Sequence, residues 1–212
     1  MIVAIDGPAG SGKSTVARLL AARIGVPYID TGAYYRCVTL KYLENKAAGM
    51  SELAEFVKNS TIEMRGKNFF LNCEDVTEKI RNNEVSRATS VVAGSKEIRI
   101  EINKILRKEG LKGGAVLEGR DIQTLVFPDA DFKFFLTASV EERTRRRQKE
   151  LEIKNCHVSP DDLAREIVAR DKNDENRDFG PLKKASDALE IDTTGMTIEE
   201  VVEKLASIVL KN

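Results

Sequence analysis

The stretch Ile2-Val3-Ala4-Ile5-Asp6, followed by Gly7-Pro8-Ala9-Gly10-Ser11-Gly12-Lys13-Ser14-Thr15, decides how this chain folds. The four apolar residues at positions 2–5 predict a strand that is buried on both faces, because a half-solvated strand would alternate apolar and polar residues. The amphipathic run over residues 15–24 predicts a helix that begins near Lys13. The opening of the chain is therefore expected to form a buried parallel strand, a glycine-rich loop and a helix in direct succession.

The loop matches the pattern G-x-x-x-x-G-K-[ST] over residues 7–14, in the strand–helix context that this pattern requires. Its glycines allow positive φ, so backbone N–H groups can converge on an anion near the positive end of the helix dipole. Lys13 supplies a cation for the β- and γ-phosphates, and the Ser14 hydroxyl is a candidate Mg²⁺ ligand. The bland alternative is a glycine-rich surface turn, which would match the whole pattern only by chance. We predict that a nucleoside triphosphate binds to Gly7, Pro8, Ala9, Gly10, Ser11, Gly12, Lys13, Ser14 and Thr15.

Composition excludes several classes of protein. The 212 residues carry 34 basic and 34 acidic side chains, which disfavours a general nucleic-acid binder. The sequence contains no run of about 18 apolar residues, so we expect no membrane span. The first strand leaves no room for a signal peptide. The 3 cysteines lack a C-x-x-C pair, as is typical of reduced thiols. We expect a cytoplasmic protein without nucleic-acid or membrane partners, and a monomer, since no long exposed apolar helix face stands out.

Five short apolar runs separated by helical patterns predict an α/β fold, a P-loop three-layer sandwich with a five-stranded parallel sheet. The expected strands are residues 2–6, 28–30, 115–117, 132–136 and 188–192. Residues 61–73 predict an inserted β-hairpin. Thr31 is the expected N-cap of the helix that follows the second strand. Capping boxes are expected at Ser139 and Thr197, and Ser159-Pro160 is expected to start a further helix.

Polar groups follow the carboxyl ends of these strands, where ligands of such folds bind. Arg36 could clamp a phosphate or be an exposed first-turn residue. Arg120 and Asp121 could read the acceptors and the amino group of cytosine, or pair with each other. The basic helix around residues 143–147 could reach a polyphosphate or be a solvated face. A face with Arg170, Asp174 and Arg177 could equally be an ion-pair ladder, so spacing alone leaves its role open.

Taken together, these segments resemble the bacterial cytidylate kinases, in the nucleoside monophosphate (NMP) kinase group of P-loop proteins. The likeness extends over about residues 2 to 205. The matching segments are residues 5–14, Asp30-Thr31-Gly32-Ala33-Tyr34-Tyr35-Arg36, Glu118-Gly119-Arg120-Asp121, Val126-Phe127-Pro128-Asp129-Ala130, Glu141-Glu142-Arg143, Arg170-Asp171 with Asp174 and Arg177, and Asp187-Ala188-Leu189 with Asp192. One departure is Gln123, where the family usually has glycine after Gly-Arg-Asp-Ile.

The resemblance implies a role for each matching side chain. The cytosine would be bound by Thr31, Ser90, Arg99 and Asp121, with Tyr35 packed near it. The acceptor phosphate would be bound by Arg36 and Arg120, and the ribose and acceptor side by Asp174 with Arg170 and Arg177. Lys13, Arg143, Arg147 and Arg170 would be the catalytic cations, and Arg143 and Arg147 would reach the donor phosphates when a lid closes.

The implied activity is transfer of the γ-phosphate of ATP to CMP or dCMP, with Mg²⁺ bound through Ser14. The implied organisation is a single kinase domain over residues 1–212, with a core of about 1–44, 86–147 and 161–212. An NMP-binding insert would span about 45–85 and a lid about 148–160. The remaining alternatives are a P-loop kinase for UMP, AMP or shikimate, a GTP-dependent switch, and a non-catalytic nucleotide-binding module. The switch is disfavoured because no N-K-x-D guanine-reading motif is present.

Overall fold

The computed structural model describes residues 1–45, 49–153, 156 and 158–211. The chain divides into two compact units, which we call the first unit (Met1–Tyr28 with Gly113–Asn212) and the second unit (Ile29–Lys112). The insert predicted over about 45–85 falls within the second unit. Residues 46–48 of that insert, and residues 154, 155 and 157 of the predicted lid, lie outside the described residues.

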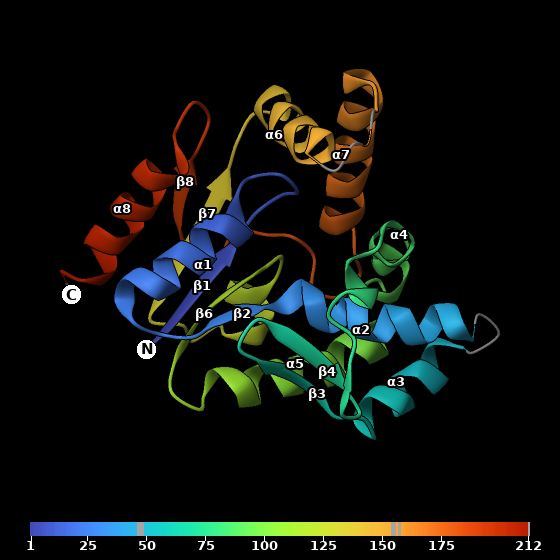
Figure 1. Cartoon of the computed structure of the whole chain (residues 1–212). Helices are drawn as coiled ribbons and strands as arrows, with labels where there is room; N and C mark the ends of the chain where they lie inside the picture. Colours follow the sequence, from blue (N-terminus) through green and yellow to red (C-terminus); the bar gives the residue numbers. More distant parts are fainter. Residues whose placement is uncertain (46–48, 154–155, 157, 212) are drawn as a thin grey trace. The chain divides into compact units, whose positions relative to one another are not determined.

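The first unit is built on the predicted parallel sheet (Figure 1). The strands of the sheet are β1 (Ile2–Asp6), β2 (Tyr28–Asp30), β6 (Ala115–Gly119), β7 (Phe132–Thr137) and β8 (Leu189–Asp192). The first unit ends at Tyr28, the first residue of β2. They lie in the order β2-β6-β1-β7-β8, and β1 pairs in parallel with both β6 and β7. All five residues of β1 and of β6 are buried, which explains the apolar runs at residues 2–5 and 115–117. The prediction of a five-stranded α/β fold is confirmed.

The main core of the first unit lies between the sheet and two helices, α1 (Lys13–Ile24) and α8 (Ile198–Val209). These helices lie side by side, as Figure 1 shows. Val16 and Leu20 of α1 and Leu205 of α8 are almost completely buried against strand residues such as Ile5 and Phe134. Because α1 is fixed by this core, the loop between β1 and α1 is fixed at both of its ends.

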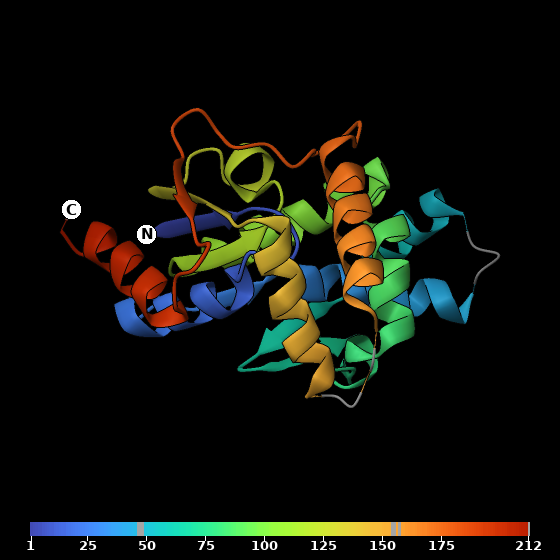
Figure 2. The same cartoon turned by 90° about the horizontal axis from the view of Figure 1, so that it is seen from above.

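Three further helices of the first unit follow β6 and β7. They are the π-helix η2 (Ile122–Val126), α6 (Val140–Glu152) and α7 (Pro160–Glu175). Helices α6 and α7 pack against each other (Figure 2). The π-helix was not expected from the sequence. Its N–H groups bond five residues back, from Val126 to the Asp121 carbonyl (3.2 Å) and from Phe127 to the Ile122 carbonyl (2.7 Å).

The second unit contains the predicted hairpin among helices. Its elements are α2 (Thr31–Glu44), α3 (Met50–Lys58), β3 (Ile62–Arg65), β4 (Asn68–Leu71), β5 (Glu74–Asp75), η1 (Lys79–Arg81), α4 (Asn83–Val92) and α5 (Lys96–Gly110). β3 and β4 pair in antiparallel fashion, as expected, and β5 adds a short third strand. The Tyr34 ring meets the Phe69 ring edge-on, at a centroid distance of 5.5 Å, which joins α2 to the hairpin.

Two helix starts differ from the sequence prediction. The N-cap of α2 is Asp30, whose carboxylate accepts from the Ala33 N–H at 3.0 Å, so the assignment of Thr31 was wrong by one residue. Ser139 caps α6 by accepting from the Glu142 N–H at 3.2 Å, but the reciprocal bond of a capping box is missing. The Ser139 N–H donates to Thr194 instead, because the Glu142 carboxylate is bound by two arginines.

The other two predicted starts are confirmed. Thr197 and Glu200 form a complete capping box at α8, and Ser159 caps α7 with Pro160 in its first turn. The cysteines in the described residues, Cys37, Cys73 and Cys156, are free thiols. Within the same residues, none of the helices combines the length and the apolar character needed to cross a membrane.

We predict that Gly7 tolerates no side chain. Its φ is +152°, and a Cβ there would lie 2.0 Å from the Leu136 carbonyl oxygen of β7. Gly7→Ala should therefore lower the free energy of unfolding by about 3 kcal/mol or more. Urea denaturation would measure the loss. Gly66→Ala is the matched control, because Gly66 also has a positive φ (+64°) but open space around it, and it should lose only about 1 kcal/mol. Equal losses for the two variants would contradict the prediction.

Candidate active site

The loop between β1 and α1 has the backbone that an anion-binding nest requires. Gly7, Gly10 and Gly12 all have positive φ, at 152°, 78° and 88°. Helix α1 begins at Lys13, immediately after Gly12. The N–H groups of its first turn have no partners within the helix and carry the positive end of its dipole. The predicted conformation of the loop is therefore confirmed, and its chemistry suits a phosphate group.

Lys13 lies inside this loop and is only 5% exposed. Its Nζ donates to the Pro8 carbonyl at 2.6 Å and lies 3.3 Å from the Ser11 Oγ. Burial, and next the positive charge of Arg120, lower the pKa of Lys13 to about 7. Phosphate oxygens in the loop would oppose both effects, since they would favour the protonated ammonium group.

The Ser14 hydroxyl donates to the Glu118 carboxylate at 2.9 Å. Glu118 sits on β6 opposite Ile5 of β1, so strand pairing places its carboxylate beside the start of α1. A hydroxyl and a carboxylate are hard oxygen ligands of the kind that Mg²⁺ prefers, and Mg²⁺ uses few protein ligands in phosphate sites. Among the described residues, no group of three or more His, Cys, Asp or Glu side chains could bind a metal alone. The residues present fit a magnesium ion shared with a nucleotide.

Asp6, the last residue of β1, is completely buried. One carboxylate oxygen accepts from the Gln123 N–H at 2.9 Å, whereas Oδ1 has no hydrogen-bond partner. Burial is the main reason that the pKa of Asp6 rises to about 7, and the charge of Asp121 adds to the rise. Sequence reasoning assigned Asp6 no role. Its contact with the start of η2 positions the turn that follows Arg120 and Asp121.

The first unit also contains a network centred on Asp174. This carboxylate accepts from Arg120 Nε at 2.7 Å and from Arg177. The ion-pair alternative raised for Asp174 and Arg177 is therefore present, and Arg120 also pairs with Asp174. Burial opposes the ionisation of Asp174, but the charges of Arg120 and Arg177 outweigh it and lower its pKa. The pKa of Arg170, one turn earlier on α7, is lowered by desolvation and then by Arg120.

Arg143 and Arg147, the two predicted catalytic arginines of α6, have different surroundings. Arg147 is exposed and pairs with Glu150 at 2.9 Å. Arg143 is 5% exposed and donates to the Ala9 and Ala138 carbonyls, both at 3.0 Å, and to Asp171. The nearby Arg146 donates to the Thr193 carbonyl at 2.7 Å. The sequence analysis quoted Asp171 in a matching segment and included Arg146 in the basic helix, but it predicted none of these contacts, because the partners are distant in sequence.

The predicted residues of the second unit are described separately. Thr31 and Tyr35 are buried on α2, and Arg36 pairs with Asp30 at 2.8 Å. Arg99 is 1% exposed, donates to the Ala93 carbonyl at 2.9 Å, and lies 5.5 Å from the centroid of the Tyr35 ring. Ser90 is exposed on α4 and donates to the Arg87 carbonyl at 3.3 Å. The unit therefore brings Tyr35 and Arg99 together as a cation–π pair.

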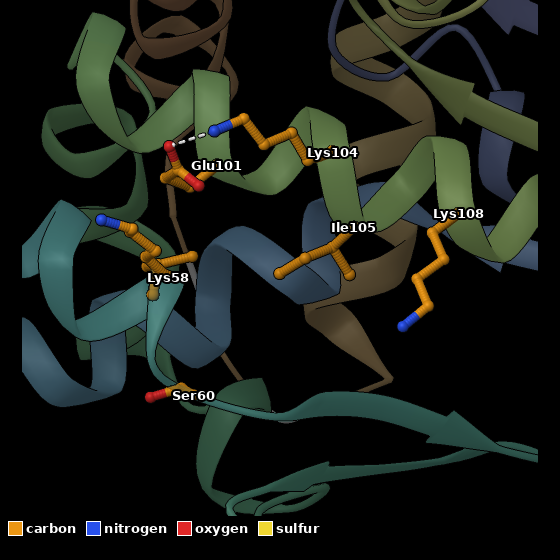
Figure 3. Close-up of a pocket in the computed structure, with 7 residues that line it drawn as sticks. Lys58, Ser60, Glu101, Lys104, Ile105 and Lys108 are labelled. Carbon is orange, nitrogen blue, oxygen red and sulfur yellow. Dashed lines mark hydrogen bonds and ion pairs between the residues drawn. The ribbon is translucent and has the colours of Figure 1, made fainter.

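A separate cavity of about 230 Å³ lies in the second unit (Figure 3). It is bounded by α3, α5 and the start of β3, and Lys58, Lys104 and Lys108 are among its lining residues. None of the predicted site residues lines it. Lys104 pairs with Glu101, and Lys58 lies in the last turn of α3, where a cation stabilises the helix dipole. Lys108 likewise lies in the last turn of its helix, α5. Phosphate-transfer chemistry is expected at the glycine loop.

A glycine loop with a buried lysine, a serine–carboxylate pair and several arginines defines a P-loop phosphotransferase. The chain matches the family model described as "Cytidylate kinase" over residues 3–211. It is 48% identical over 209 residues to the cytidylate kinase of Clostridioides difficile (strain 630), covering 98% of this chain and 97% of that protein. It is 49% identical over 212 residues to the cytidylate kinase of Fervidobacterium nodosum, covering 98% and 95%. The chain belongs to the cytidylate kinase family.

Solved structures support the fold. A shikimate kinase from Bacteroides thetaiotaomicron aligns with a TM-score of 0.52 at 17% identity, covering 99% of this chain and 98% of that chain. An uncharacterised protein from Eubacterium ventriosum ATCC 27560 aligns with a TM-score of 0.57 at 15% identity, covering 100% and 99%. At such identities the likeness concerns the fold alone.

Gln123, the departure from the family pattern, is 1% exposed and bridges distant segments. Its Oε1 accepts from the Ala185 N–H at 3.1 Å, and its Nε2 lies 3.5 Å from the Phe134 carbonyl of β7. Its backbone N–H binds Asp6. The side chain therefore joins the turn after Asp121 to the sheet and to the segment that precedes β8.

We predict that Gln123→Ala lowers the free energy of unfolding by about 1–3 kcal/mol, because the Ala185 N–H loses its buried acceptor. Thermal and urea unfolding would measure the loss. Gln148→Ala, on the half-exposed surface of α6, is the matched control and should stay within about 0.5 kcal/mol. A loss at Gln123 no larger than that of the control would show that the bridge contributes nothing.

Proposed function

We propose that this chain transfers the γ-phosphoryl group of ATP to CMP or dCMP and releases ADP with CDP or dCDP. The bond between Pγ and the β–γ bridging oxygen breaks, and an oxygen of the acceptor phosphate forms the new bond to Pγ. The observation that carries the proposal is the buried Lys13 within a complete P-loop, in a chain that belongs to the cytidylate kinase family. The curated relatives named above are cytidylate kinases, which favours this acceptor over AMP or shikimate.

The donor side is assigned to the first unit. Backbone N–H groups of the P-loop and the Lys13 ammonium group would bind the β- and γ-phosphates. Pro8 has no N–H, and the Ala9 N–H donates to Asp171 instead. Ser14 and Glu118 would hold Mg²⁺, directly or through water, and the ion would neutralise phosphate charge when bound. Arg147 and Arg170 are the candidates for cations that contact the transferred group. Arg143 was predicted to act in the same way, and its contacts with Ala9 and Asp171 suggest a second role, argued below.

The acceptor side is assigned by family resemblance. Asp121 would accept from the cytosine amino group, which uracil lacks, and this difference would favour CMP over UMP. The other assignments to the base and acceptor phosphate are Thr31, Tyr35, Arg36, Ser90, Arg99 and Arg120. Asp174 with Arg170 and Arg177 would bind the ribose and the acceptor phosphate. Two arginines hold the Asp174 carboxylate in place, which would reduce the cost of positioning it toward a ribose hydroxyl.

The chemistry requires no general base, since a phosphate oxygen of CMP is already an anionic nucleophile. Catalysis would depend on in-line positioning and on cations around the moving phosphoryl group. Closure of the insert (about 45–85) and the lid (about 148–160) would exclude water and limit ATP hydrolysis.

An acceptor panel tests the proposal. A coupled ADP-release assay with ATP and Mg²⁺ should give rapid turnover with CMP and dCMP, and slower turnover with UMP, AMP, GMP and shikimate. Asp121→Ala should raise the KM for CMP by roughly tenfold or more, equivalent to about 1–3 kcal/mol of base recognition. Asp161→Ala, an exposed aspartate on α7, is the control and should leave kinetics unchanged. Fastest turnover with AMP or shikimate would refute the acceptor assignment. ATP binding without turnover of any acceptor would support the non-catalytic alternative.

The Mg²⁺ assignment makes a separate prediction. Glu118→Gln keeps the shape of the side chain but removes its charge, so the concentration of Mg²⁺ needed for half-maximal turnover should rise by roughly tenfold. Titration of Mg²⁺ at saturating ATP and CMP would measure the shift. Glu203→Gln, on the exposed face of α8, is the charge-matched control. An unchanged Mg²⁺ requirement in the Glu118 variant would remove Glu118 from the metal site.

A further inference from the structure

Asp171 on α7 is a carboxylate for which neither the motif nor the family resemblance supplies a role. It is 9% exposed, and both of its oxygens are engaged. Oδ1 accepts from the backbone N–H of Ala9, in the middle of the P-loop, at 3.2 Å. Oδ2 accepts from the guanidinium group of Arg143, on α6. This one side chain of α7 therefore contacts both the loop and α6.

Arg143 completes the arrangement from the other side. The same Nη1 that binds Asp171 also donates to the Ala9 carbonyl at 3.0 Å. Its Nε donates to the Ala138 carbonyl at 3.0 Å, which fixes the direction of the guanidinium plane. A Cβ at Gly10 would lie 3.1 Å from the Arg143 Cβ, so the loop also packs closely against α6. Both backbone polar groups of Ala9 are thus bound by this ion pair.

Two explanations of these contacts are possible. The ion pair could only hold α6 against α7, or it could also hold the P-loop in shape. Holding the two helices together would need only the ion pair. Here the pair also makes two hydrogen bonds to the backbone of Ala9, a residue of the phosphate-binding motif. A loop whose N–H groups face an anion cannot use those groups to hold its own shape, so external contacts must do so. The second explanation accounts for all of the contacts.

We propose that Asp171 is a positioning residue, which together with Arg143 fixes the Ala9 segment and so holds the P-loop in its donor-binding shape. The inference rests on the proposed function, because it assumes that ATP is the ligand of the loop. Helix α7 also carries Arg170 and Asp174, so the same contact links the donor loop to the helix of the acceptor-side residues. Arg143 then acts through the loop, and its contribution does not require contact with phosphate.

The first test is Asp171→Asn, which keeps the size of the side chain but removes its charge. Binding of a fluorescent ATP analogue should weaken by roughly tenfold or more, because a small displacement of the loop misplaces several N–H groups at once. The KM for ATP should rise to match, whereas the KM for CMP should change by less than about threefold. Asp162→Asn is the matched control, since Asp162 lies on the same helix in an exposed ion pair with Arg165. It should leave both constants unchanged.

The second test is a double-mutant cycle with Arg143→Lys, which keeps the charge but loses the planar fork. If the two residues act as one unit on the loop, the double variant should bind the ATP analogue about as weakly as the weaker single variant. Additive losses would overturn the proposal. If a folded Asp171→Asn variant binds ATP normally and only its melting temperature changes, Asp171 serves only to hold α6 against α7.

Two further outcomes are separable from these. If Asp171→Asn fails to fold, Asp171→Glu keeps the charge and displaces the carboxylate by one methylene, and the same selective loss of ATP affinity is expected. If the wild-type chain binds the ATP analogue but does not phosphorylate CMP, the proposed function fails. The role of Asp171 in shaping the loop would still be decided by the binding measurements.

Discussion

A backbone loop that presents its N–H groups to an anion needs support from its surroundings. The amides that face the phosphate are unavailable for turns or ladders, so the shape of the loop depends on other contacts. In this chain those contacts come from all sides. The Leu136 carbonyl of β7 lies against Gly7. Asp171 and Arg143 bind the backbone of Ala9, and the Lys13 ammonium group donates to the Pro8 carbonyl. The sheet, α6 and α7 therefore form a supporting frame that holds the loop in shape.

The charges of the first unit show the same dependence. Burial is the largest cause of the raised pKa of Asp6 and of the lowered pKa of Lys13, so both groups are held in surroundings that disfavour their charged forms. Arg120 meets a different outcome, because Asp174 and Glu118 outweigh its desolvation and raise its pKa. A phosphate group placed among these cations would offset the repulsion between them. The site is thus complementary to an anion before any anion binds.

The parts of the structure that could be predicted are those with a local pattern. Residues 2–14 specify strand, loop and helix within one short segment, and the five strands follow from short apolar runs. Errors arose where several polar groups compete for one partner. Asp30 caps α2 in place of Thr31, and Glu142 leaves its capping box for Arg145 and Arg146. Asp171 could not be predicted, because its partner Ala9 is 162 positions away in sequence.

Gln123 stands at a position where the resemblance led us to expect glycine, and its side chain is part of the contacts that support this region. Its side chain is buried at the start of the π-helix, directly after the Arg120–Asp121 turn, and finds partners in Phe134 and Ala185. The wider π-turn bonds Val126 back to Asp121, so the backbone after the predicted base-reading residue is tied at both ends. A glycine could adopt the same turn but could not bridge it to β7 and the segment before β8. The Gln123 side chain therefore adds contacts that connect this turn to β7 and to the segment before β8.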